Sequence, residues 1–232
     1  MLRALINLFR SEDPLAEMGN DFSQMLDLTL DMTKQAGGLY FESDSSPETR
    51  TRLYKVDIQV NRLERRVRKH LVAHLSLAGN QRDVPYGLAL MSLVKDVERL
   101  GDYAKNLAEV SDIHPEPLGD SEIVGELREI RTLVEESFSE SLEVFAEFDN
   151  ERAQQLILEG RNLTKRCDTL LVRIAHSDYG ASMTTALVLG SRYYKRIAAH
   201  VLNVLSAIVM PLHKLDYYDE DAITLESEED ED

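Results

Sequence analysis

Six long stretches of the chain repeat apolar residues at intervals of three and four, with polar residues at most other positions. This spacing places the apolar side chains on one face of an α-helix. One stretch shows it well, with apolar residues at Leu93, Val97, Leu100, Ala104 and Leu107. Strand-like alternation is missing, so the pattern predicts an all-α protein whose six long helices pack antiparallel through short loops.

Proline and glycine punctuate these stretches. Asp13–Pro14 is a good helix start, because a capping carboxylate precedes a proline at the first helical position. Asn150 is the expected cap of the fifth helix. The expected breaks lie at Ser43–Pro47, Gly79–Pro85, Pro115–Gly119, Ser177–Gly180 and Pro211.

The proline-rich joint divides the helices into three and three. We therefore expect an N-terminal amphipathic segment (1–13), a first three-helix bundle (14–114), a linker (115–119), a second three-helix bundle (120–213) and an acidic disordered tail (214–232). The tail is expected because residues 216–232 contain ten acidic side chains and no basic one. Such a run repels itself and cannot bury apolar area.

The two halves also resemble each other, which suggests a duplicated unit. The third helix (DVERLGDYAKNLAEV) aligns with the sixth (YYKRIAAHVLNVLSA) when Arg99 is matched to Arg196. Gly101 then falls opposite Ala198 in the alignment, and these small residues predict a close approach of helices. The same comparison matches Asn61 of the second helix to Asp168 of the fifth, in a register that we treat as provisional.

Charge and cysteine content narrow the classes of function. The net charge of −16 opposes binding to nucleic acid, which needs a basic surface. The single cysteine, Cys167, permits no intrachain disulfide, as expected in a reducing cytosol. The long helices contain regular charges, so we expect a cytoplasmic protein that meets a membrane only through partners.

Glu98 and Asp102 stand four residues apart on the third helix, so their carboxylates project from one face. Like charges at this spacing repel each other. A solvated helix edge tolerates the repulsion, whereas a bound cation or a partner's basic group relieves it. A second candidate, His70 and His74, has metal-ligand spacing but no apparent third ligand.

Residues 96–109, with the sequence DVERLGDYAKNLAE, closely resemble the signature helix of the PhoU family of phosphate-uptake regulators. The resemblance implies two three-helix bundles over residues 14–213. Some family members bind metal through acidic pairs of the form E/D-x-x-x-D. The matching positions here are Asp57, Asn61, Glu98 and Asp102, which the resemblance marks as a site for iron, zinc or another divalent ion.

The second half departs from this pattern. Lys195 and Ala199 occupy the positions that match Glu98 and Asp102. A lysine would place its own cation where the metal should bind, so the site is expected in the first bundle alone.

The resemblance also implies a function. Family members are negative regulators thought to couple a phosphate ABC transporter to a sensor histidine kinase, so transporter components and the kinase are the expected partners. Arg99 and Arg196 are candidate partner-binding residues. A homodimer is left open, and the alternative function is a non-catalytic accessory subunit of another phosphate or anion permease. The chain has no Glu-x-x-His, no H-E-x-x-H, no phosphate-binding loop and no G-x-S-x-G, so no catalytic residue is expected.

Overall fold

The computed structural model describes residues 14–42 and 47–216, so the amphipathic segment 1–13 and nearly all of the acidic tail lie outside the described residues. Within this part of the chain there are six α-helices and no strand, which confirms the all-α prediction. The helices are α2 (Pro14–Glu42), α3 (Pro47–Leu75), α4 (Val84–Glu109), α5 (Glu122–Glu147), α6 (Asn150–Ala175) and α7 (Ala181–Val209), with short 3-10 turns η1 (Gln81–Asp83), η2 (Val110–Asp112) and η3 (Leu212–Lys214). None of the described helices is apolar over a length that would cross a bilayer.

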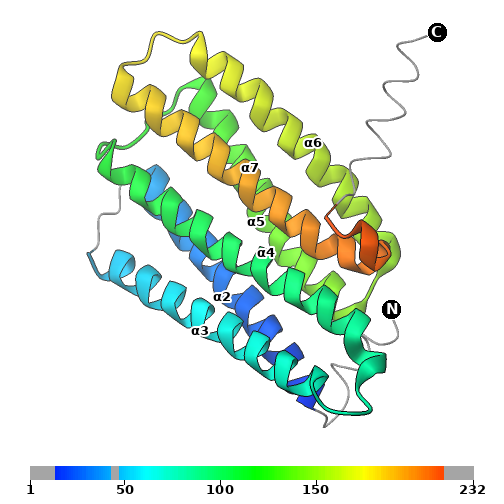
Figure 1. The fold of residues 1–232 in the computed structure, drawn as a ribbon. Helices are drawn as coiled ribbons and strands as arrows, with labels where there is room; N and C mark the ends of the chain where they lie inside the picture. The colour runs from blue at the N-terminus through cyan, green and yellow to red at the C-terminus, as the bar shows by residue number, and fades with distance from the viewer. Residues whose placement is uncertain (1–13, 43–46, 217–232) are drawn as a thin grey trace, which may run out of the picture.

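The helices form two three-helix bundles that lie side by side. α2, α3 and α4 pack on one another, as do α5, α6 and α7, and the bundles meet through α4 against α7 and α2 against α5. Figure 1 shows the order α3, α4, α7, α6 across the molecule, with α2 and α5 behind them. The fold is therefore the repeated three-helix arrangement predicted from the sequence.

One continuous hydrophobic core runs through both bundles. The predicted apolar stripe of α4 lies in it, and Leu100 is fully buried. The joint between the bundles is also packed, because Leu118 of the expected linker is only 5% exposed.

Two boundaries differ from the sequence-based expectation. Asp149, rather than Asn150, is the N-cap of α6, because its carboxylate accepts a hydrogen bond from the Arg152 amide at 3.0 Å. The described chain also packs beyond residue 214, where the tail was expected to begin. Leu215, directly after the η3 turn, is buried, so apolar packing includes the first residues that the sequence assigned to the tail.

Candidate functional site

A lysine lies between the two helices that present the candidate metal ligands. The ammonium of Lys105, on α4, is 3.3 Å from Oδ2 of Asp57 on α3 and 3.4 Å from Oδ1 of Asp102 on its own helix. The hairpin thus brings Asp57 and Asp102 to one place, as the sequence predicted. The cation that joins them comes from the protein itself.

The other two candidate ligands lie beside this bridge. The Asn61 amide donates to Oδ2 of Asp57 at 3.4 Å, which leaves its carbonyl oxygen as a neutral acceptor. Glu98 pairs with Lys95 at 2.6 Å, and Arg99 lies 3.5 Å from Asp102. Within residues 14–42 and 47–216, no three His, Cys, Asp or Glu side chains come close enough together to hold a metal ion.

The electrostatics of this cluster favour a protonated lysine. Burial raises the pKa of Asp57, Lys105 opposes that shift, and the carboxylates of Asp102 and Glu98 add to it. Burial lowers the pKa of Lys105, but Asp57 and Asp102 raise it by more, so the net shift is upward. A divalent ion at this site would therefore have to displace a bound ammonium group.

The second bundle carries a simpler pair at the corresponding place. Lys195 on α7 lies 2.5 and 2.6 Å from the two carboxylate oxygens of Asp168 on α6. Thr164, one turn earlier on α6, donates its hydroxyl back to its own helix. The ammonium of Lys195 is thus held against a carboxylate.

The sequence did not predict a polar cluster that lies at the contact between α4 and α7. Asp96, only 7% exposed, accepts from Asn203 Nδ2 at 2.8 Å and lies 2.7 Å from His200 Nδ1. The ring of Tyr103 stacks on that of His200 with centroids 5.5 Å apart. Asp96 lies more than one hundred positions from both His200 and Asn203 in sequence. Only the pairing of the third helix with the sixth could have pointed to them.

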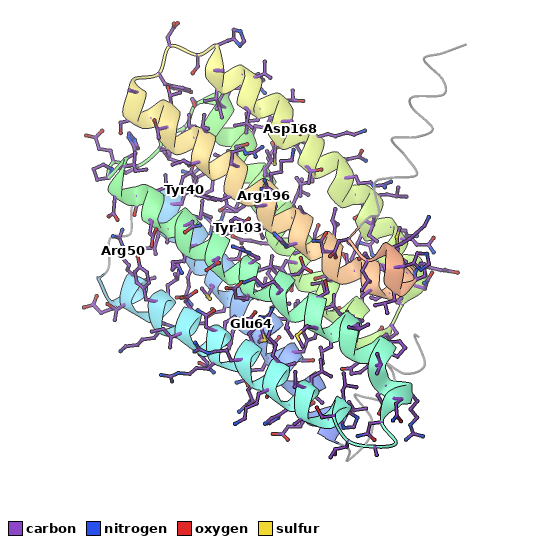
Figure 2. The ribbon with its side chains drawn as sticks, in the orientation of Figure 1. Tyr40, Arg50, Glu64, Tyr103, Asp168 and Arg196 are labelled. Carbon is purple, nitrogen blue, oxygen red and sulfur yellow. The ribbon has the colours of Figure 1, made fainter. Side chains whose placement is uncertain are left out.

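The contact between α4 and α7 also determines where the two candidate partner-binding residues, Arg99 and Arg196, lie relative to each other. Asp96 meets His200 on one side of Arg99, and Tyr103 meets Tyr193 on the other. Arg99 and Arg196 are therefore level with each other across α4 and α7. Figure 2 shows Arg196 and Tyr103 close together in the middle of the molecule. Arg196 is exposed and has no ion-pair partner within the described ranges.

The remaining candidates have structural explanations. His74 lies 2.9 Å from Asp83 in the loop that follows α3, and Asn80 donates to its backbone carbonyl. This arrangement holds the hairpin together and supplies no further ligand for His70. Cys167 is fully buried, and burial raises the pKa of its thiol to about 12, so it is an unreactive core residue.

The chain therefore belongs to the class of all-helical proteins built from two repeated three-helix bundles, which here meet through their third helices, α4 and α7. Residues 22–111 match the family model described as the PhoU domain. The matched range covers most of the first bundle and includes residues 96–109, so the resemblance noted there is confirmed.

Solved structures extend the likeness to both bundles. PhoU from Pseudomonas aeruginosa superposes with a TM-score of 0.74 at 22% identity, covering 84% of this chain and 95% of that one. The phosphate transport system regulatory protein PhoU from Streptococcus pneumoniae gives a TM-score of 0.71 at 16% identity, covering 87% and 94%. At these identities the likeness establishes the fold. Curated proteins gave no significant match.

Proposed function

We propose that this chain is a regulator of phosphate uptake, acting by contact with components of a phosphate ABC transporter and with a sensor histidine kinase. The observation that carries the proposal is the match of residues 22–111 to the PhoU domain. It is supported by a fold that spans almost the full length of two PhoU proteins. We propose a binding role without catalysis, in which the protein recognises its partners through its surface.

The surface proposed for that recognition is the seam between α4 and α7. Arg99 and Arg196 stand level there, and neither is buried. Asp96, His200 and Asn203 fix the two helices against each other beneath them. A rigid seam that presents two guanidinium groups suits acidic side chains on a partner, because arginine binds carboxylates in a fixed geometry.

The experiment is a genetic and a binding test together. Deleting the gene should raise phosphate uptake in phosphate-rich medium, and the parent chain should restore normal uptake. Purified transporter ATPase and kinase should bind the parent chain, and Arg99→Glu with Arg196→Glu should weaken that binding. Lys34→Glu with Arg82→Glu, two exposed cations elsewhere, is the matched control. If deletion changes uptake of a different anion and leaves phosphate uptake unaltered, the accessory-subunit alternative replaces the proposal.

We further propose that the cluster at Asp57 can exchange its lysine for a metal ion. The cluster supplies carboxylates from two helices and the neutral carbonyl of Asn61, a donor set that suits a divalent cation. Lys105→Gln should tighten binding, because it removes the competing ammonium group. Glu98→Ala with Asp102→Ala should abolish it.

The measurement is thermal melting across a titration of iron, zinc or manganese, with elemental analysis of the protein. Binding to the native state raises the melting temperature with metal concentration. Absence of any shift in the Lys105→Gln variant would exclude a metal at this cluster. It would leave the regulator proposal unaffected, since that depends on partner binding.

A further inference from the structure

One exposed stripe of α3 is basic and lies outside the seam proposed for partner binding. It consists of Lys55, Ile58, Arg62, Arg65, Lys69 and Val72, which we call the basic stripe. Its members are three or four residues apart, so they line a single helix face about 25 Å long. The apolar members are well exposed, with Ile58 at 48% and Val72 at 58%.

The four cations of the basic stripe have no ion-pair partner among residues 14–42 and 47–216, in contrast to other cations of α3. Arg66 pairs with Asp21 of α2, Arg68 pairs with Glu64, and Arg52 pairs with Asp31 at 3.2 Å. Beyond Arg50, the acidic residues of α3 are Asp57 and Glu64, and both are buried. The outward face of this helix therefore has a single sign of charge, on a chain whose net charge is −16.

On the matching helix of the second bundle, α6, basic side chains do form ion pairs. Two arginines of α6, Arg166 and Arg173, pair with glutamates of α5 at 3.0 and 2.7 Å. On α3, Arg52 and Arg66 pair with aspartates of α2, whereas the cations of the basic stripe are exposed and have no such partner among the described residues. Figure 1 shows why, since α3 lies at the edge of the molecule. Figure 2 shows its side chains extending outward there.

The composition of the basic stripe discriminates between kinds of anionic partner. Stable protein interfaces have an apolar centre and few lysines. Here the centre is Arg62, Arg65 and Lys69, and the apolar residues Ile58 and Val72 flank it. A convex helix edge with several cations on one face suits a flat anionic surface, where the attraction depends on how many lysine and arginine side chains lie near the lipids. The exposed aliphatic side chains on either side of the three cations can enter the headgroup region.

We propose that the basic stripe binds an anionic phospholipid membrane directly, holding the protein on the membrane surface with α3 as the contact edge. This goes beyond the expectation that the chain meets a membrane only through its partners. The remaining negative charge of the molecule opposes such binding little at physiological salt, because it is screened beyond about 8 Å. Binding should be weak, reversible and strongly salt-dependent.

The test is flotation of the full chain with vesicles of phosphatidylcholine containing 30% phosphatidylserine, against pure phosphatidylcholine. The parent should float with the anionic vesicles only, and less at high salt. Arg62→Glu, Arg65→Glu and Lys69→Glu together should reduce binding at least about tenfold, because each cation near an anionic surface contributes roughly a factor of five. Lys34→Glu, Arg82→Glu and Arg192→Glu, which change the net charge equally at exposed positions outside the basic stripe, should bind like the parent.

A second set of variants separates a membrane from a protein partner. Arg62→Lys, Arg65→Lys and Lys69→Arg together preserve the charge and should preserve flotation, whereas recognition through arginine geometry would be lost. Circular dichroism and melting temperature check that all variants fold. Equal flotation of the parent and the charge-reversed variant overturns the proposal, as does equal binding to both vesicle types. Binding to an acidic polypeptide such as poly-glutamate without any flotation also overturns it. The regulator proposal is tested separately by uptake and partner binding.

Discussion

The hydroxyl group of Tyr194 is enclosed by the core and has no hydrogen-bond partner among the described residues. Its neighbour Tyr40 is equally buried, yet its hydroxyl donates to the Ala186 carbonyl at 3.0 Å. Both rings pack around Phe41, which also lies beneath the guanidinium of Arg128. Two tyrosines in one aromatic cluster thus differ by a single hydrogen bond.

This difference predicts opposite effects of removing each hydroxyl. Tyr194→Phe should leave the free energy of unfolding unchanged or raise it by up to about 1 kcal/mol, because it removes an unsatisfied buried group. Tyr40→Phe should lower it by about 1 kcal/mol, because it leaves a buried carbonyl without its donor. Urea denaturation of both variants beside the parent measures the two changes. Destabilisation of similar size in both would show that Tyr194 has a partner.

Asp216, the last described residue, has an unusual backbone conformation and an unusual carboxyl pKa. Its backbone has φ = 70°, a left-handed conformation in which asparagine is well tolerated. Burial raises the pKa of its carboxyl to about 6, and the nearby Asp96 carboxylate adds to the shift. The folded state therefore binds a proton more readily than the unfolded state, whose aspartate titrates near pH 3.9.

Linkage then gives the sign of the pH effect. Between about pH 4 and 6 the folded state holds more protons at this site, so the contribution of Asp216 to stability falls as pH rises. Asp216→Asn should raise stability at pH 7 to 8 by about 1 kcal/mol or less, because the side chain is partly screened by solvent. The gain should disappear near pH 4. Melting curves across this range test it, and a gain that persists at pH 4 would point to backbone conformation as the cause.

The sequence predicted some contacts at this scale and missed others. The proximity of Asp57 and Asp102 was predicted, because a helical hairpin fixes which positions face each other. The role of Lys105 was not predicted, although a lysine three residues after Asp102 can form an ion pair within the same helix. The sequence could not predict the contact of Asp96 with His200, because that contact depends on how the two bundles pack.

At the scale of elements, the period of the apolar residues predicted every described helix, since burying one face dictates that spacing. Sequence was less informative about where helices approach most closely. Gly101 was expected to mark a close approach, but a methyl group there would meet Thr29 and Met32 at ordinary distances of 3.5 and 3.6 Å. A much tighter position is Gly190 on α7, where an added Cβ would collide with the ring and hydroxyl of Tyr40.

These two glycines give a matched pair of substitutions. Gly101→Ala should stabilise the protein by up to about 1 kcal/mol, since alanine favours the helix and the space is sufficient. Gly190→Ala should destabilise it by about 1 to 3 kcal/mol, because Tyr40 must leave its place and its bond to Ala186. Thermal and urea unfolding compare them directly. A tolerated Gly190→Ala would mean that α2 and α7 can separate without loss.

At the scale of the whole molecule, the repeat seen in the sequence becomes an arrangement of two similar bundles around the α4–α7 contact. The aligned residues Arg99 and Arg196 stand level across that contact, as expected if an approximate two-fold axis passes between them. The sequence predicted two bundles but left open whether they lie end to end or side by side. The arrangement of the bundles depends on which apolar residues each bundle would leave exposed if it stood alone. On α4 and α7 such residues are buried where the two helices meet.

The continuous core predicts that the two bundles unfold together. Leu53→Ala in α3 and Leu170→Ala in α6 each remove a buried side chain, at 1% and 0% exposure, and each should cost about 2 to 5 kcal/mol. Because α4 packs on α7 and α2 on α5, loosening either bundle removes support from the other. Differential scanning calorimetry should therefore show one transition in the parent and in both variants, with the calorimetric enthalpy close to the van't Hoff enthalpy. If either variant instead shows two transitions, with the unmutated bundle melting at the parental temperature, then residues 14–114 and 120–213 are independent folding units and the shared core is only a docking surface.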